Sequence, residues 1–277
     1  MMPCFWSGVS DVNNPAPSYR SPAVAGRFYS SDPEVLGQQL HYWLDVPLAH
    51  SPKSCPKVLM VPHAGYLYSG EVAARAFALL KPFSQQIRRV VLFGPMHRQG
   101  FCGIAIPSVD VFETPIGGIP IDRKMLASLL MNPGVLVSDE AHAFEHSIEV
   151  QLPFLRCVLD AFVLVPLAMG ITEEARVGEV VERVWGGRET LLVVSTDLSH
   201  FLSGASARRR DQLTLRRILN LSPTLEAEDA CGASAINGVL RAASARGLQA
   251  ELLAATHSGE TTGDMTRVVG YGAVALW

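Results

Sequence analysis

Long hydrophobic runs are missing from this chain of 277 residues. No stretch approaches the roughly 18 consecutive apolar residues of a transmembrane helix, and the longest one, FVLVPLAMGI at 162–171, has the length of a buried strand and its exit. The first residues, MMPCFWSGVSDVNNPAPSYRSP, lack the basic start and apolar core of a secretion signal. We therefore expect a soluble cytoplasmic protein that has no membrane partner.

Paired cysteines and a strong charge of one sign are also absent. The five cysteines are odd in number and scattered, and no CxxC motif occurs, so neither a disulfide framework nor a structural zinc knuckle is expected. The net charge of −3 argues against a surface that binds nucleic acid or anionic membranes. Hydrophobic residues make up 48% of the chain, which suits a globular protein with a sizeable core.

After residue 20, apolar runs typical of buried strands alternate with segments of helical periodicity. This alternation predicts an α/β sandwich with a largely parallel central sheet and antiparallel edge strands. No linker-like stretch divides the chain, so we expect one domain at 21–277, preceded by an extended arm at 1–20. The expected core strands lie at 57–62, 88–95, 162–170 and 190–197, a strand pair at 103–117, closing strands at 249–259 and 266–277, and helices at 70–80, 122–132, 146–159, 173–185, 205–219 and 232–246.

Polar residues follow three of the four core strands. His63 and His97 each come just after an apolar run, and a third run leads into STDLSH, which contains Asp197 and His200. A single histidine at a strand end often only bonds a nearby carbonyl. Parallel strands, however, bring their carboxyl ends to one edge of the sheet, where open α/β folds bind ligands. Several imidazoles and a carboxylate at that edge favour a metal site.

Two further residues each allow a structural and a functional interpretation. Cys231 lies where the helix at 232–246 begins, and a thiol at a helix N-terminus has a lowered pKa and binds metals readily. The sequence equally allows Cys231 to be a small packing residue, followed by a glycine because a neighbouring segment comes close there. Tyr66, in the loop after His63, either lines a pocket or packs with its hydroxyl bonded.

A competing hypothesis rests on HAFEH at 142–146, which fits the H-x-x-E-H pattern of certain zinc proteases. In that pattern His142 and His146 share a helix face as zinc ligands, and Glu145 activates water. Five-residue patterns also arise by chance. This hydrolytic interpretation is therefore the lesser one.

Seven short motifs follow one another along residues 20–277: AGRFY (25–29), PHAGYLYSG (62–70), GPMHR (94–98), TPIGGIPID (114–122), EHSIEVQLPFL (145–155), STDLSH (195–200) and CGASAI (231–236). Together they resemble the MEMO-like family, which includes the component B proteins of the AmmeMemoRadiSam system. The resemblance implies a fold similar to the LigB-type, class III extradiol dioxygenases, which are non-heme iron enzymes.

The resemblance also implies roles for individual residues. His63, His97 and Cys231 look like metal ligands, with Asp197 and His200 beside them as catalytic residues. His146 and Glu149 are carried over as pocket or supporting residues, while His142 is not required by the family pattern, which weakens the protease hypothesis.

The implied cofactor is one metal ion, with Fe(II) or copper favoured over zinc because imidazoles and a thiolate suit softer, redox-active ions. Two functions remain open at this stage, because fold alone does not decide activity. One is a metal-dependent redox enzyme that acts on a small molecule. The other is a binding module that captures a metal or an anionic peptide without turnover. The resemblance further implies a functional link to radical-SAM and AMMECR-like proteins.

Overall fold

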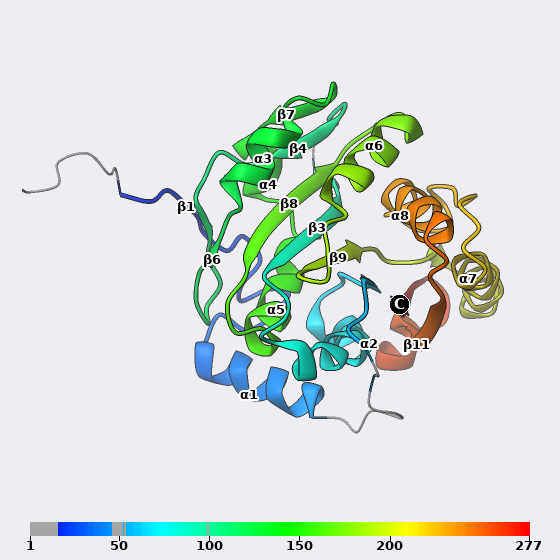
Figure 1. Cartoon of the computed structure of the whole chain (residues 1–277). Coiled ribbons are helices and arrows are strands. Elements are labelled where there is room, and N and C mark those ends of the chain that lie inside the picture. The colour runs from blue at the N-terminus through cyan, green and yellow to red at the C-terminus, as the bar shows by residue number, and fades with distance from the viewer. Residues whose placement is uncertain (1–15, 46–51, 53, 99) are drawn as a thin grey trace, which may run out of the picture.

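The computed structural model describes residues 16–45, 52, 54–98 and 100–277 (Figure 1). Within these residues, no helix is both long and apolar enough to cross a membrane. Most of the expected N-terminal arm, residues 1–15, lies outside the described part of the chain. Its last two residues form a short strand, β1 (Tyr19–Arg20), which pairs with β5 (Val111–Phe112).

Four parallel strands form the centre of the main sheet. In spatial order they are β2 (Val58–Val61), β9 (Thr190–Ser195), β3 (Arg89–Pro95) and β8 (Val163–Met169). Nearly every residue in them is buried, because strands covered on both faces need continuous apolar sequence rather than alternation. All four runs were predicted as core strands, and their neighbours in the sheet confirm the parallel centre.

Antiparallel strands flank this centre on both sides. The strand β12 (Val268–Leu276) pairs with β2, and also with β10 (His200–Leu202) and β11 (Ala250–His257). On the other side β4 (Ile104–Ile106) runs antiparallel to β8. The predicted α/β fold with antiparallel edges is therefore confirmed.

The prediction that two strands within 103–117 pair with each other is wrong. The backbone of β4 is already paired, with β8 on one side and with β7 (Val135–Val137) on the other. The following strand, β5, instead pairs with β6 (Ile119–Pro120) and β1 in a separate three-stranded sheet.

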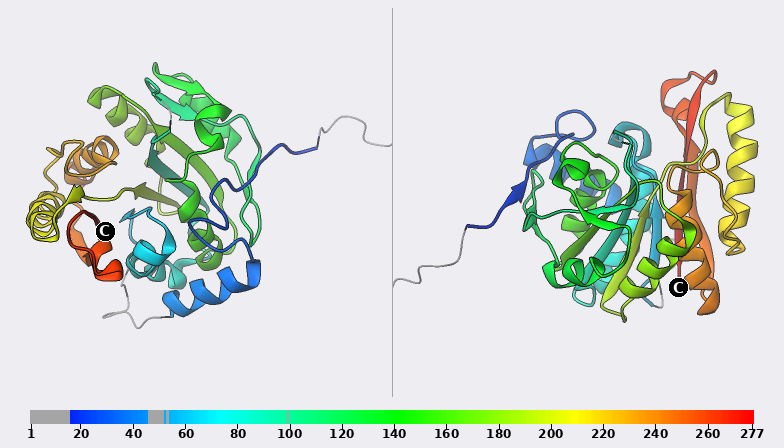
Figure 2. Two further views of the ribbon diagram at one scale, coloured as in Figure 1. Left: turned by 180° about the vertical axis from the view of Figure 1, so that it is seen from behind. Right: turned by 90° about the horizontal axis from the view of Figure 1, so that it is seen from above.

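Helices cover both faces of the parallel strands. In Figure 1, α1 (Pro33–Leu44), α2 (Tyr66–Phe77) and α5 (Leu152–Val158) gather on one side, and α6 (Glu174–Val184) and α8 (Ala233–Ala245) on the other. Figure 2 shows α7 (Gly204–Leu219) beside β11, near the C-terminal strands. The remaining helical segments are α3 (Arg123–Leu129), α4 (Asp139–Ala143), α9 (Ser258–Thr262), η1 (Ala78–Phe83) and η2 (Glu149–Gln151).

The predicted helix at 146–159 is shorter than expected. Pro153 occupies the first turn of α5, which begins at Leu152, because proline is tolerated where a helix has no partner for the backbone N–H. The residues before it form the 3-10 turn η2 and an irregular segment at 144–148. This departure from a helix determines where His146 lies.

Candidate metal centre

Two of the sequence-predicted histidines meet because of the strand order. His63 lies two residues beyond β2 and His97 two residues beyond β3, and β9 lies between these two parallel strands. Their carboxyl ends therefore share one edge of the sheet. The imidazole rings of His63 and His97 are 5.0 Å apart between centroids.

A third imidazole, from His146, completes the cluster. One ligand atom each from His63, His97 and His146 can be chosen so that all three lie within 4.8 Å of one another. Sequence analysis gave His146 only a pocket or supporting role, whereas the structure places its ring centroid 5.4 Å from that of His63 and 4.7 Å from that of His97. The three residues together could hold a metal ion.

The segment that contains His146 packs directly against the end of β3. A Cβ atom at Gly94 would lie 2.5 Å from the Oγ of Ser147 and 2.7 Å from a side-chain carbon of Ile148, so only glycine permits this approach. The hydroxyl of Ser147 also donates a hydrogen bond to the carbonyl of Pro95, 2.8 Å away. Gly94 in the GPMHR motif thereby positions His146 as well as His97.

Ser195 fixes the tautomer of His63. Its hydroxyl donates its one hydrogen to the carbonyl of Ser147, 2.6 Å away, and accepts from the side-chain amide of Gln151 at 2.8 Å. The Nδ1 atom of His63, 2.9 Å from the same oxygen, must therefore be the donor. Nε2 of His63 is then the unprotonated nitrogen, and its lone pair is the one that a metal ion would use.

Glu145 orients the ring of His97 and lies close to that of His146. One carboxylate oxygen lies 3.1 Å from Nδ1 of His97 and 3.2 Å from Nδ1 of His146, which leaves Nε2 of each ring available. Backbone N–H groups of His97, His146 and Ser147 also donate to this carboxylate. Burial alone would raise the pKa of Glu145, but these imidazole and backbone neighbours hold it well below its ordinary value.

The donor set fits a metal ion. Burial, and then the neighbouring His97 and His146, lower the pKa of His63 well below its ordinary value, so its ring is the neutral form that binds metals. Metal–nitrogen bonds of about 2.0–2.1 Å place two ligand nitrogens roughly 3–4 Å apart. The three ligand atoms lie within 4.8 Å of one another, so a bound ion would draw them closer together.

Cys231 lies beside this cluster, at the start of the segment that leads into α8. Its Sγ atom is 3.3 Å from Nε2 of His63 and 3.2 Å from the backbone N–H of Asp197, which donates to it. Gly232 is needed for close approach, since a Cβ there would lie 2.8 Å from the Cβ of Thr196. The expectation of a lowered thiol pKa is wrong: burial, and then the charge of Asp197, raise the pKa of Cys231 to about 12.

Asp197 is buried beside His63. Its carboxylate accepts a hydrogen bond of 2.8 Å from the backbone N–H of His63 and lies 4.0 Å from Nε2 of that ring. Burial raises the pKa of Asp197 to about 7. Among the residues the structure describes, no hydrogen bond or ion pair joins Asp197 to His200, so it does not orient that ring as a catalytic partner would.

His200 is half-buried at the start of β10. Burial lowers its pKa, with a smaller contribution from His97. The register between β10 and β12 shifts after His200, and Phe201 adopts a φ of 58°, a conformation that aromatic residues rarely accept. Such bulges redirect side chains next to functional sites.

Two further residues lie in the core: Tyr66, which was expected as a pocket wall or a packing residue, and Glu149, which was expected as a pocket or supporting residue. The hydroxyl of Tyr66 donates to the carbonyl of Val150 at 2.8 Å, and its ring packs against Trp43 and Phe154. Glu149 is fully buried and accepts hydrogen bonds from the side chains of Arg20 and Tyr29. Through these buried contacts Tyr66 and Glu149 support the segments that carry the site.

The zinc protease pattern is not realised. Helix α4 ends at Ala143, so His142 and His146 do not share a helix face. Nε2 of His142 donates to the carbonyl of Ala105 at 3.0 Å, and its ring packs against Phe112. Only His146 joins the histidine cluster.

Burial of His142 predicts a pH-dependent loss of stability. Burial lowers its pKa to about 4, against about 6.5 in an unfolded chain. Unfolded protein therefore binds the proton first as the pH falls, so the stabilisation is complete above pH 6.5 and is lost between pH 6.5 and 4. Urea unfolding should show that wild type loses about 3 kcal/mol more than His142→Gln over this range. Parallel curves for the two proteins would contradict this assignment.

Sequence reasoning underestimated the residues that hold the histidines. Glu145 was considered only as a hydrolytic base, and Ser195 and Gln151 were not singled out. Ser195 ends a buried strand and Gln151 lies on an otherwise apolar helix start, so both are buried polar groups that need partners. That requirement is the signal that could have identified them.

Comparison with known proteins matches nearly the whole chain to one family. Residues 20–275 match the Memo-like protein family. A MEMO1 family protein of Methanosarcina barkeri is 37% identical over 271 residues, covering 93% of this chain and 99% of the relative. One from Methanopyrus kandleri is 34% identical over 280 residues (93% and 98%), and one from Aquifex aeolicus is 32% identical over 266 residues (91% and 97%).

Proposed function

The chain belongs to the Memo-like protein family, and on this premise we propose that it is a metal-dependent redox enzyme related to the extradiol dioxygenases. His63, His97 and His146 hold one ion, and Cys231 supplies a sulfur ligand. The observation that carries the proposal is the convergence of three oriented imidazoles within 4.8 Å. Bond lengths of about 2.0–2.1 Å for nitrogen and 2.3 Å for sulfur imply a nitrogen–sulfur distance near 3.6 Å, close to the 3.3 Å between His63 and Cys231.

Fe(II) or copper suits this site better than zinc, because thiolate and imidazole together favour softer, redox-active ions. Such an ion would supply the means to activate dioxygen beside a bound organic diol. The protein's own contribution is to keep His63 neutral and to hold the three rings through Ser195 and Glu145.

His200 is the residue best suited to move a proton. Its pKa is lowered by burial, so it is unprotonated at neutral pH and able to accept a proton from a substrate hydroxyl.

Replacing His200 with alanine is expected to leave metal content unchanged and to lower kcat about 100- to 10,000-fold, the usual contribution of a general base. Metal analysis and oxygen uptake on the same sample separate the two effects. The exposed residue His41, on α1, provides a matched control as His41→Ala. Loss of metal from His200→Ala would make this residue a ligand rather than a base.

The experiment for the function itself is anaerobic purification, metal quantification and reconstitution with Fe(II), followed by oxygen uptake over a panel of catechols. Turnover with both oxygen atoms entering the product supports the enzyme.

A second function, metal binding without turnover, is favoured by Cys231, because a thiolate close to iron and dioxygen is liable to oxidation. Stoichiometric metal without uptake on any substrate would favour this binding module.

A further inference from the structure

A carboxylate lies on the face of α7 that packs against β11 and β12, where a helix normally places apolar or small side chains. Asp211 is only 7% exposed and shares this buried face with Ala207 and Leu215. Among the described residues, no ion pair reaches its carboxylate. Burying a carboxylate is costly unless hydrogen-bond donors compensate it, so the donor that Asp211 does have indicates what the residue is for.

That donor is the peptide group between Leu198 and Ser199. Oδ1 of Asp211 accepts a hydrogen bond of 3.0 Å from the backbone N–H of Ser199. Burial raises the pKa of Asp211, and this bond offsets part of the rise. Gly270 on β12 makes the approach possible, because a Cβ atom on that residue would lie 2.6 Å from Cγ of Asp211. Asp211 therefore reaches across β12 to the segment that carries His200.

The same peptide group holds the ring of His200. Its N–H belongs to Ser199 and its carbonyl to Leu198, and the two lie in one rigid plane. Burial lowers the pKa of His200, and a hydrogen bond between the ring and the backbone of Leu198 offsets part of that effect. A bond that raises the pKa of an imidazole is one that the ring donates, so the acceptor is the carbonyl. Asp211 and His200 are thus connected through a single peptide.

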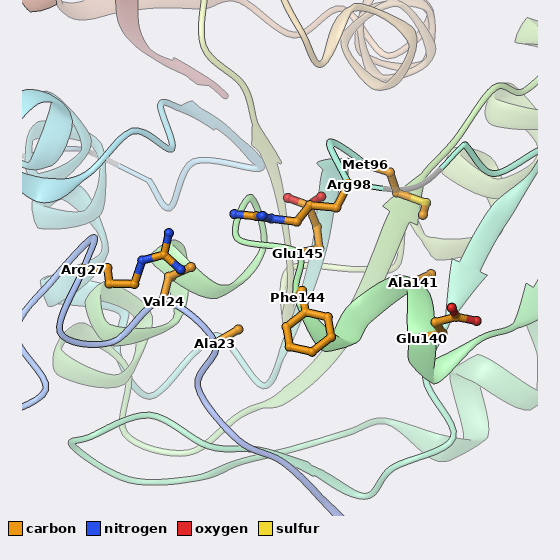
Figure 3. A pocket seen from close by; sticks show the side chains of 9 residues that line it. All are labelled: Ala23, Val24, Arg27, Met96, Arg98, Glu140, Ala141, Phe144 and Glu145. Atoms are coloured by element: carbon orange, nitrogen blue, oxygen red, sulfur yellow. The ribbon is translucent and has the colours of Figure 1, made fainter.

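The carboxylates of the metal centre do not make such a connection. In the described part of the chain, Asp197 makes no hydrogen bond or ion pair with His200. Glu145 lies with Phe144 in the wall of a cavity (Figure 3). Its oxygens accept from Nδ1 of His97 and from backbone N–H groups. Of the three carboxylates, only Asp211 is connected to the ring of His200.

Backbone contacts on both sides keep the peptide in this orientation. The N–H of Leu198 donates to the carbonyl of Gly270 at 2.8 Å, and the N–H of Gly270 donates to the carbonyl of Ser199 at 2.9 Å. After His200, the backbone of Phe201 takes its φ of 58°. The peptide cannot turn unless these contacts break, so the position of its carbonyl is set by the fold.

We propose that Asp211 is a positioning residue for His200, acting through the Leu198–Ser199 peptide as a carboxylate beside a catalytic histidine acts by direct contact. The negative charge polarises the peptide, so its carbonyl accepts more strongly from the imidazole. One ring nitrogen is thereby kept protonated, and the other is free to accept a proton. This rests on the proposed function, since the role requires His200 to move a proton.

The test observes the imidazole of His200 by NMR, in full-length protein with isotopically labelled histidine, both free of metal and loaded with diamagnetic zinc. Ring nitrogen shifts report the tautomer, and their titration reports the pKa. The His200→Ala spectrum identifies the signal. Asp211→Asn keeps an oxygen that accepts from the N–H of Ser199 but removes the charge, and Asp211→Leu removes both. Gly270→Ala displaces the carboxylate without altering it.

A matched control is Asp122→Asn. Asp122 is also a buried carboxylate, and it accepts a hydrogen bond of 2.9 Å from the backbone N–H of Met125 at the start of α3. This variant should reproduce any general cost of replacing a buried aspartate. The His200 signal should not change in it.

We expect wild type to populate one tautomer of His200. Asp211→Leu and Gly270→Ala should mix the two tautomers and shift the protonation equilibrium about 2- to 10-fold toward the neutral ring, as expected for the loss of one net hydrogen bond. Asp211→Asn should keep the tautomer and show a smaller shift. With an active substrate, kcat should fall by a similar factor in Asp211→Leu, while KM and metal content stay unchanged.

An unchanged tautomer and titration of His200 in Asp211→Asn and Gly270→Ala would overturn the proposal, even if Asp211→Leu fails to fold. An equal change in Asp122→Asn would overturn it too, because general destabilisation would then be the cause. Failure of the proposed function is recognised separately. If wild type consumes no oxygen with any substrate but the His200 signal still depends on Asp211, the connection stands while the redox enzyme fails.

Discussion

Replacing His97 with alanine is expected to lower the affinity for metal by well over 100-fold. The variant removes a nitrogen that the strand order brings within 4.8 Å of its two partners. Changing a residue that merely orients a ligand costs about 10- to 100-fold in metal affinity, so loss of the ligand itself must cost more. The fold should persist, because Glu145 keeps its backbone donors at His146 and Ser147.

Glu145→Gln provides the graded comparison. This substitution keeps the shape of the side chain but removes the negative charge beside Nδ1 of His97 and His146. The variant should therefore bind the metal about 10- to 100-fold more weakly than wild type. Competition titrations with a coloured chelator measure both variants against wild type and the His41→Ala control. Equal metal affinity in wild type and His97→Ala would remove His97 from the centre.

Replacing Arg20 with methionine is expected to lower the free energy of unfolding by about 3–5 kcal/mol, the usual cost of leaving one member of a buried ion pair alone. Glu149 is 0% exposed and Arg20 only 7%, and their charged atoms are 2.8 Å apart. Arg20 also donates to the carbonyls of His142 and Glu145, so it ties the N-terminal segment to the metal-binding one.

Two controls separate charge from packing in this prediction. Arg20→Met combined with Glu149→Gln should recover part of the loss, because no uncompensated buried charge remains. Lys81→Met breaks an exposed pair with Asp45, which solvent screens, and should change the free energy of unfolding far less than Arg20→Met does. Urea unfolding measures all three variants, and a loss below 1 kcal/mol for Arg20→Met would show that the pair is not a structural link.

Much of the fold follows from sequence because its strands are continuous apolar runs. The runs that became β2, β3, β8 and β9 are buried on both faces, so their pattern alone marks them as a parallel centre. Once these four are neighbours, His63 and His97 must lie at one edge. This part of the site needs no tertiary information beyond the rule that parallel strands end together.

The rest of the site depends on tertiary contacts that no local pattern contains. His146 was expected in a helix, whereas the gap at Gly94 and the bonds of Arg20 hold its segment in an irregular path. The pKa of Cys231 was expected to be low from its place before α8, but burial dominates. Tyr66 and Glu149 belong to the same sequence motifs as the site residues but lie in the core. A motif can contain residues that pack against a site as well as residues of the site itself.

The measurement that bears most directly on the metal centre is anomalous X-ray diffraction from crystals of the Fe(II)-loaded protein, collected above and below the iron absorption edge. We predict one anomalous peak about 2.0–2.3 Å from Nε2 of His63, His97 and His146 and from Sγ of Cys231. A peak bound to other residues, or none in crystals shown to contain stoichiometric iron, would contradict the account.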